Sequence, residues 1–342
     1  MAAKAYVSRL KLVFLGSDPI ARPLLEWLAG EGSGVATLIA VFTQPDRPVG
    51  RGQKITSNEI KTWALARGLP VFQPEKLTDE VSAQLAALGA DVALVMAYGH
   101  ILRDEFISTP RLGTLNLHTS LLPKYRGASP IQSAIASGER ETGVSLMRIV
   151  RKLDAGPLAD VERVSIAPLD TALDVEAKLA LACVPLVARS LPRLAAGTLE
   201  FATQDDGAVT HCRKLGKEDG ALDFTAPASA LAARINGLFP WPASTVEIDG
   251  QSVKFGLAEV ADLNAGTRTG GEVIGSDAEG LLIATGHGVL RVRRLQRAGG
   301  RMLPATEFLR GCSIPMGTTL GSRPMRELVT RFAAVAPARA VR

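Results

Sequence analysis

Short apolar runs alternate with amphipathic segments through the N-terminal part of the chain, and this alternation constrains the fold more than any other feature. Strands that alternate with helices form parallel sheets with helices on both faces. The sequence therefore predicts an α/β domain with a doubly wound, Rossmann-like parallel sheet. We expect its strands at 10–16, 35–42, 69–72, 91–97, 112–117 and 142–150, and its helices at 17–28, 60–66, 80–88, 130–136 and 171–193.

A second, smaller domain is expected in the C-terminal part, because 342 residues exceed what a single core usually organises. After the apolar periodicity lapses, one helix at 227–237 precedes several short apolar runs at hairpin spacing. This pattern is typical of a small antiparallel β-barrel of the OB kind. We expect a first domain at 8–196, a linker at 197–212, the OB-like domain at 213–331 and a disordered tail at 332–342.

Composition restricts the class of protein. The three cysteines, Cys183, Cys212 and Cys312, lie far apart without a CxxC pair, which disfavours both a disulfide framework and a zinc site. No segment reaches the roughly 18 apolar residues of a membrane span, and no signal peptide is evident. We therefore expect a cytoplasmic protein without a membrane anchor. Its net charge of +5 permits a polyanionic partner without requiring one.

Asn116 and His118 come at the end of an apolar run, before Ser, Pro and Gly residues that break regular structure. They should therefore stand at the carboxyl end of a strand, which is the edge where open α/β sheets bind ligands. A single histidine in such a place is more often structural than catalytic. The first strand is followed by a lone Gly16 rather than GxGxxG, so a dinucleotide-binding dehydrogenase loses its main support.

Two groups of basic residues could contact a phosphate backbone. Residues 43–54 contain two prolines, two glycines and three basic residues, which predicts a long irregular loop. Near the C-terminal end, Arg291 and Arg293 share one face of a strand while Arg294 opposes them. The alternative for both groups is a solvated surface. Taken together, they indicate a possible RNA track.

Several motifs resemble the 10-formyltetrahydrofolate-dependent formyltransferases: Asn-Leu-His at 116–118, Ser-Leu-Leu-Pro-Lys-Tyr-Arg-Gly at 120–127, Thr-Gly-Val-Ser at 142–145 and Leu-Asp-Ala-Gly at 153–156. Stretches at 43–54, 69–74, 97–99, 213–218, 239–242 and 295–300 extend the resemblance to the branch that acts on methionyl-tRNA. The matches cover both expected domains. The resemblance implies transfer of the formyl group of 10-formyltetrahydrofolate to the amino group of initiator methionyl-tRNA, without a metal.

The resemblance also implies roles for particular residues. It makes Asn116, His118 and Asp154 the catalytic trio. It places the folate beside Ser120, Leu121, Leu122, Pro123, Ala97, Tyr98 and Gly99. The tRNA-binding residues that we expect are Arg47, Arg51, Lys54, Lys214, Arg291 and Arg293. One departure lies at 16–21, where Gly-Ser-Asp-Pro-Ile-Ala stands for the family's Gly-Thr-Pro-x-Phe-Ala, which bears on the shape of the neighbouring pocket and not on the reaction.

The chemistry agrees with these roles. Formyl transfer needs a neutral amine, a donor for the oxygen that gains charge, and a proton for the departing folate nitrogen. Asn116 and His118 can donate from one strand face, and Asp154 can orient the imidazole. One alternative is a folate-dependent formyltransferase or deformylase that acts on a small molecule. Another is a non-catalytic RNA-binding protein, which leaves the catalytic trio without a purpose. We expect a monomer.

Overall fold

The structure is a computed structural model that describes residues 9–50, 52–263 and 269–331. The described residues group into two compact units. The first unit contains the stretches up to Pro123, Gly143–Val164 and Ala177–Ala208, and the second contains Lys124–Thr142, Ser165–Glu176 and the residues from Val209 on. The tail expected at 332–342 lies outside the described residues.

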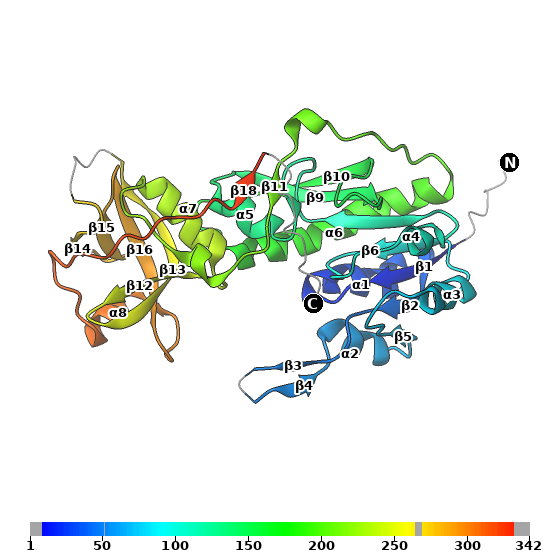
Figure 1. The fold of residues 1–342 in the computed structure, drawn as a ribbon, viewed down its shortest axis with the longest axis horizontal. Helices are drawn as coiled ribbons and strands as arrows, with labels where there is room; N and C mark the ends of the chain where they lie inside the picture. The colour runs from blue at the N-terminus through cyan, green and yellow to red at the C-terminus, as the bar shows by residue number, and fades with distance from the viewer. Residues whose placement is uncertain (1–8, 51, 264–268, 332–342) are drawn as a thin grey trace, which may run out of the picture. The chain divides into compact units, whose positions relative to one another are not determined.

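A seven-stranded sheet forms the centre of the first unit (Figure 1). Strands β1, β2, β5, β6 and β7 run parallel to one another, which confirms the predicted Rossmann-like sheet. Strand β9 pairs antiparallel with β7. In spatial order the strands are β10 (Leu158–Ser165), β9 (Glu141–Arg148), β7 (Thr114–His118), β6 (Val92–Val95), β1 (Leu10–Leu15), β2 (Ala36–Phe42) and β5 (Val71–Phe72).

Helices and loops cover both faces of this sheet. The side chains of Val13 and Leu15 on β1 belong to the core beneath α3 and α4, while Leu12 and Phe14, which alternate with them, are equally buried. Burial on both faces is the property that a doubly wound sheet requires. The helical elements of the chain up to residue 195 are η1 (Pro19–Ala21), α1 (Arg22–Ala29), η2 (Glu31–Gly34), α2 (Glu59–Leu65), α3 (Asp79–Ala87), α4 (Asp104–Ser108), α5 (Pro130–Ala136) and α6 (Ala172–Ala195).

The basic stretch after β2 forms a β-hairpin, so the prediction that residues 43–54 lack regular structure was wrong. Strand β3 (Arg47–Val49) pairs antiparallel with β4 (Lys54–Thr56), and Pro48 lies opposite Ile55. A proline is tolerated because each strand of a two-stranded ribbon is an edge strand, so the missing N–H can face solvent. Figure 1 shows the hairpin as an arm that extends from the sheet of its own unit.

An antiparallel sheet forms the second unit, which confirms the expected C-terminal β domain. Its path is β12 (Ser244–Ile248), β13 (Gln251–Asp262), β16 (Val289–Arg297), β15 (Leu281–Ala284) and β14 (Val273–Ser276), with β17 (Leu303–Pro304) beside β16. Helices α7 (Ala228–Leu238) and α8 (Ala305–Gly311) contribute to its core, in which Phe224, Ile235, Phe255 and Leu290 are fully buried. The short helices η3 (Asp206–Ala208) and η4 (Lys217–Gly220) precede the sheet.

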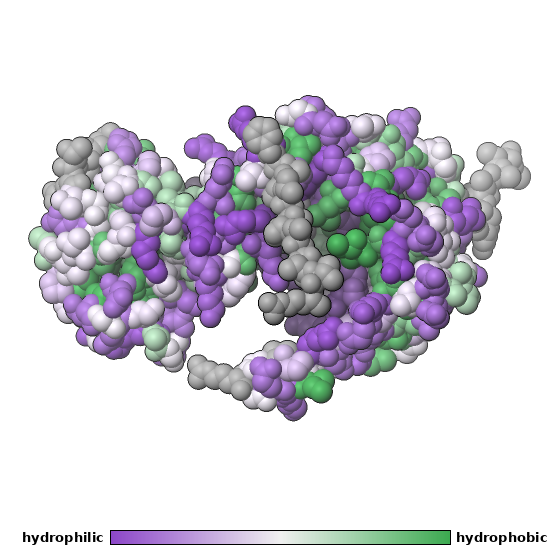
Figure 2. Space-filling view, viewed as in Figure 1, coloured by the Kyte–Doolittle hydropathy of each residue, from purple (hydrophilic) through white to green (hydrophobic). Residues whose placement is uncertain are grey.

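A small three-stranded sheet in the second unit joins distant parts of the sequence. Strand β11 (His211–Cys212) pairs in parallel with β8 (Arg126–Gly127) and antiparallel with β18 (Val329–Thr330). Hydrophilic residues are spread over the viewed face of the molecule, and hydrophobic residues occupy small separate areas (Figure 2). No helix among residues 9–50, 52–263 and 269–331 is long and apolar enough to span a bilayer.

Candidate active site

Strand β7 carries Asn116 and His118 between two neighbours in the sheet. Asn116 pairs with Val95 of β6 on one side and with Met147 of β9 on the other. Residues two apart on a strand share a face, so the side chains of Asn116 and His118 project in the same direction. His118 is 7% exposed and Asn116 is half-buried. Both residues therefore lie at the end of a central strand, as the sequence predicts.

Asp154 lies against His118. Its Oδ1 is 3.7 Å from Nδ1 of the imidazole, and the two side chains are 10% and 8% exposed. This distance is longer than a hydrogen bond, and it allows a strong charge interaction when the imidazole is protonated. Asp154 belongs to the loop between β9 and β10 and has φ +50°, in the left-handed region. Non-glycine residues persist in that region only where their surroundings hold them, which is common at functional sites.

The loop of Asp154 is fixed by two contacts that sequence reasoning missed. The buried amide of Gln204 donates hydrogen bonds to the carbonyls of Asp154 and Gly156, at 2.9 and 2.7 Å. A Cβ at Gly156 would lie 1.8 Å from the carbonyl oxygen of Arg148, so only glycine allows this approach to β9. Gln204 is far from Asp154 in sequence, and no local pattern reveals the pairing.

The segment Ser120–Pro123 is held in shape by Ser145 on β9. The hydroxyl of Ser145 donates to the carbonyl of Ser120 at 2.7 Å and accepts from the N–H of Leu122 at 3.1 Å. Ser120 and Ser145 are completely buried, and the N–H of Ser120 donates to the carbonyl of His118. The shape of the predicted folate loop therefore depends on a residue that the sequence showed only as part of a motif.

Ala97, Tyr98 and Gly99 form the turn that follows β6. Ala97 has φ +48°, and Ala97 and Gly99 are exposed residues while Tyr98 is buried. Burial raises the pKa of the Tyr98 phenol. The carbonyl of Tyr98 accepts a hydrogen bond of 3.0 Å from the side-chain amide of Gln44. This turn thus combines a strained backbone with two exposed residues beside the edge where β7 ends.

The segment that departs from the resembling motif retains a polar role. The hydroxyl of Ser17 accepts hydrogen bonds from the backbone N–H of Gln44 at 2.9 Å and from the hydroxyl of Thr43 at 3.2 Å. The carboxylate of Asp18 accepts from the N–H of Ile20 and caps η1. The residues Gly-Ser-Asp-Pro at 16–19 therefore form a hydrogen-bonded turn, although the proline is displaced from its place in the family's motif.

The predicted tRNA-binding residues of the first unit lie on the hairpin. Arg47 on β3 is exposed and forms an ion pair of 2.7 Å with Glu75. Lys54 on β4 is exposed, and the register places it opposite Val49. Arg51 lies outside the described residues. The structure thus assembles Arg47 and Lys54 on one two-stranded arm, although sequence reasoning expected an irregular loop.

Arg291 and Arg293 lie among carboxylates. Arg291 forms ion pairs with Glu259, Asp277 and Glu279, at 2.9, 2.7 and 3.2 Å. Arg293 contacts Glu259 and Glu279, at 3.3 and 3.5 Å. The shared contact with Glu259 agrees with two side chains on one strand face. Two arginines among three carboxylates present no net positive charge. Lys214, the other residue predicted to bind tRNA in this unit, is exposed.

Two remaining features bear on other chemistries. In the part of the chain that the structure describes, no group of three or more His, Cys, Asp or Glu residues could hold a metal ion. His100 packs edge-on against Tyr98, with ring centroids 5.0 Å apart.

Comparison with known proteins matches both parts of the chain to one family. Residues 10–187 match the family described as Formyl transferase, and residues 214–313 match Formyl transferase, C-terminal domain. The methionyl-tRNA formyltransferase of Thiobacillus denitrificans is 40% identical over 314 residues, which are 92% of this chain and 100% of the relative. The enzyme of the same name from Ralstonia nicotianae is 39% identical over 92% of this chain and 99% of its own length.

Solved structures share the fold at lower identity. WlaRD, a sugar 3N-formyl transferase solved with dTDP and 5-N-formyl-THF, has a TM-score of 0.61 at 17% identity, over 86% of this chain and 100% of that one. An N-formyltransferase of Helicobacter canadensis, solved with folinic acid and dTDP-3-aminofucose, has a TM-score of 0.61 at 19% identity, over 84% of this chain and 99% of that one. At these identities the likeness concerns the fold alone.

Proposed function

The chain belongs to the formyl transferase family, and from this membership we propose that it transfers the formyl group of 10-formyltetrahydrofolate to the free amino group of initiator methionyl-tRNA. The products are formylmethionyl-tRNA, which serves translation initiation, and tetrahydrofolate. The relatives named methionyl-tRNA formyltransferase support this acceptor, because they align over nine-tenths of the chain. The observation that carries the chemistry is the approach of Asp154 to His118, on the strand face that also holds Asn116.

The residues beside the trio fit a folate. A pterin ring is planar, and its edge carries donors and acceptors that peptide groups can match. The turn with the exposed residues Ala97 and Gly99 can provide such groups, and the segment Ser120–Pro123 provides a rigid wall because Ser145 fixes its shape. The co-substrate supplies the formyl group. We infer that these two segments bind and orient it.

Asn116 and His118 stabilise the charge that develops during the transfer. An α-amino group has a pKa near 8, so a useful fraction of the acceptor is neutral near pH 7. When the amine adds to the formyl carbon, the formyl oxygen gains negative charge. The side-chain amide of Asn116 donates to this oxygen, and the imidazole of His118 donates beside it. A fixed donor in a site that excludes water is typically responsible for about a hundredfold in rate or more.

Asp154 takes part in the proton transfers of the reaction. The new carbon–nitrogen bond forms as the amine loses a proton, and the bond to the folate nitrogen breaks as that nitrogen gains one. Asp154 holds the imidazole in its orientation, because its carboxylate lies beside Nδ1. It also accepts the amine proton through water and returns a proton by the same route to the departing folate nitrogen, so that the transfer leaves the protonation of the site unchanged.

We propose the domain boundaries that the sequence predicts. Residues 8–196 form the catalytic domain, 197–212 the linker and 213–331 a tRNA-binding domain, in a cytoplasmic monomer. The hairpin residues Arg47, Arg51 and Lys54 serve the tRNA. A formyltransferase or deformylase for a small molecule would leave the hairpin and the β domain without an evident use.

Mass spectrometry of aminoacyl-tRNA tests the proposal directly. Incubation with 10-formyltetrahydrofolate should add a formyl group to methionyl-tRNA, more efficiently for the initiator than for the elongator species. Free methionine and glycinamide ribonucleotide serve as small acceptors. The Asp154→Asn variant should lose the transfer while it retains tRNA affinity. Formylation of a small acceptor with none on methionyl-tRNA would contradict the proposal, as would full activity of the variant.

A further inference from the structure

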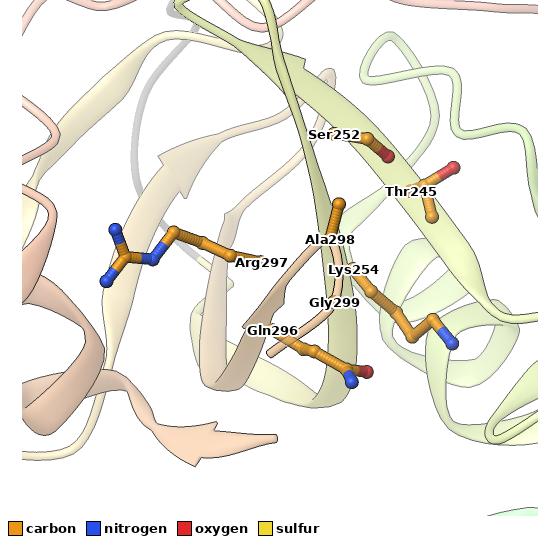
Figure 3. Close-up of a pocket in the computed structure, with 7 residues that line it drawn as sticks. All are labelled: Thr245, Ser252, Lys254, Gln296, Arg297, Ala298 and Gly299. Atoms are coloured by element: carbon orange, nitrogen blue, oxygen red, sulfur yellow. The ribbon is translucent and has the colours of Figure 1, made fainter. Parts of the chain in front are cut away.

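The outer face of the C-terminal sheet contains a polar concavity that no role assigned above uses. It measures about 140 Å³, well above the roughly 10–15 Å³ that one water needs. We propose that it binds a backbone phosphate of the tRNA, an inference that rests on the proposed function. Its lining residues, shown in Figure 3, are Thr245, Ser252, Lys254, Gln296, Arg297, Ala298 and Gly299.

Three of these residues form a row across neighbouring strands. The register pairs Thr245 of β12 with Lys254 of β13, and Lys254 with Gln296 of β16. Adjacent strands lie about 4.8 Å apart, so the three side chains span roughly 10 Å on one face. The residues that alternate with Lys254 and Gln296, Phe255 and Leu295, are fully buried in the core. The row therefore faces outward by the pleat of the sheet.

Lys254 gives the concavity its charge. Within the described ranges no carboxylate lies within 4.0 Å of its ammonium group, although the side chain is half-buried. Figure 3 shows the Arg297 side chain directed away from those of Lys254 and Gln296, and its guanidinium lies over the ring of Phe308. Glu247 is exposed on the same sheet face and pairs across the strands with Ser252, without an ion pair to Lys254.

This arrangement contrasts with that of Arg291 in the same sheet. Arg291 has three carboxylate partners, so a phosphate would have to displace them. A lysine without a carboxylate partner can pair with a phosphate directly, and the counterion that the nucleic acid then releases favours binding. Because Arg291 and Arg293 are paired with carboxylates and Lys254 is not, we assign the phosphate contact of this unit to Lys254.

The other polar groups that line the concavity are hydrogen-bond donors, and a fixed turn borders them. Gln296 donates to the carbonyl of Gly300, and the N–H of Gly300 donates to the carbonyl of Arg297, which together fix the turn that borders the site. Thr245 and Ser252 add two hydroxyl donors to the lining of the concavity. Hydroxyl, amide and lysine donors are the groups that proteins use to position nucleic-acid phosphates.

A second cationic side chain, that of Arg323, lies close to β12, the strand of Thr245. Arg323 donates a hydrogen bond of 2.9 Å to the carbonyl of Thr245, and its own N–H donates to the carbonyl of Leu222. These contacts place the guanidinium at the edge strand β12 without neutralising it. Positive charge thus continues past Thr245 along the edge of the sheet.

The test compares the salt dependence of tRNA binding for four full-length proteins: the natural chain, Lys254→Gln, Lys11→Gln and the double variant Arg291→Gln with Asp277→Asn. Lys11 is exposed at the beginning of β1, away from the edge where that sheet holds the candidate site, so it controls for the loss of one charge. The double variant removes an ion pair at constant net charge. Loss of one phosphate contact should lower the slope of log affinity against log salt by about 0.7–0.9.

We expect that reduction for Lys254→Gln alone, with thermal unfolding unchanged. An unchanged slope in Lys254→Gln would overturn the assignment, and a reduced slope in the double variant with none in Lys254→Gln would return the contact to Arg291. If the natural chain shows no salt-dependent tRNA binding, the proposed function itself fails. A further arm adds inorganic phosphate against chloride at equal ionic strength. Stronger displacement of tRNA by phosphate from the natural chain than from Lys254→Gln would show that both ligands use this site and would support the inference, whereas equal displacement from the two proteins would overturn it.

Discussion

Gln204 holds the backbone of Asp154 through a side-chain amide that is almost completely buried. The same amide group bonds the carbonyl of Gly156, so both sides of Ala155 are fixed at once. The catalytic carboxylate that we propose is thus positioned by a residue from a separate segment of the first unit. A group that acts in this way changes the rate through geometry and not through contact with the substrates.

Gln204→Ala should therefore lower kcat while the KM for methionyl-tRNA stays within about twofold. The expected loss is about 10- to 100-fold, because a displacement near 1 Å at a reacting group has that effect. The free energy of unfolding should also fall by about 1–3 kcal/mol, since buried carbonyls lose their donor. Steady-state kinetics and urea denaturation measure both quantities. Gln251→Ala, at an exposed strand position, is the control, and equal kcat in the two variants would contradict a positioning role.

His118→Ala and Asp154→Asn should each lower turnover by about two orders of magnitude or more, because each removes an electrostatic or proton-transfer group. Both variants should keep folate affinity, which depends on the segment fixed by Ser145. Single-turnover formylation with saturating folate separates the two effects. Wild-type turnover in a folded variant would remove that residue from the trio.

Neutralising Arg47, Arg51 and Lys54 together should weaken the use of tRNA and leave folate binding intact. The hairpin presents exposed Arg47 and Lys54 side chains, and phosphate contacts depend on such charges. The apparent KM for methionyl-tRNA should rise, and the rise should be greatest at low salt. Glu75→Gln frees Arg47 from its ion pair and should act in the opposite direction. An unchanged KM in the triple variant would leave the hairpin as a solvated surface arm.

Asp219 should make the second unit sensitive to acid. Burial raises the pKa of its carboxyl, but hydrogen bonds from Arg213 and from the N–H of Gly216 outweigh this and hold the pKa below its usual value. A depressed pKa stabilises the folded state above the unfolded pKa of about 3.9, and this stability is lost as pH falls through the folded value.

Asp219→Asn should accordingly lower the free energy of unfolding by about 1–3 kcal/mol at pH 7, with a smaller difference below about pH 3. Asp249→Asn, on an exposed turn, is the matched control and should show little change at either pH. Urea denaturation at the two pH values measures the effect. A difference that stays constant down to low pH would rule out ionisation as the cause.

Apolar patterning predicted the sheet because buried parallel strands are nearly continuous hydrophobic runs, as in β1 and β6. Strand β10 was missed because only Val164 among its residues is buried, so it lacks that signal. The hairpin was misjudged because proline and glycine mark loops in general, although an isolated ribbon tolerates them. Local pattern is therefore informative where a strand is covered on both faces, and weak at edges.

The resemblance to the formyltransferases predicted Asn116, His118 and Asp154, and the structure brings Asp154 to the face of β7 on which the other two lie. It did not predict Gln204 or Ser145, whose hydrogen bonds depend on how distant segments meet. Nor did it predict that Glu259, Asp277 and Glu279 surround Arg291, because those acids come from other strands and turns. Charge counted along a sequence says little about the charge that a partner meets.

The pairing of β8 with β11, described above for the small sheet, has a consequence for the order in which the chain is made. Ribosomes release Arg126 and Gly127 long before His211 and Cys212, and Val329 of the same sheet comes almost last. Helix α5 also waits for α7, against which it packs so closely that a Cβ at Gly237 would lie 2.5 Å from the backbone nitrogen of Ala136. At roughly 5–20 residues per second, the early segment therefore spends several seconds without its partners during synthesis. Nascent chains stalled near Leu199 should hold this segment open to proteases that the finished protein resists.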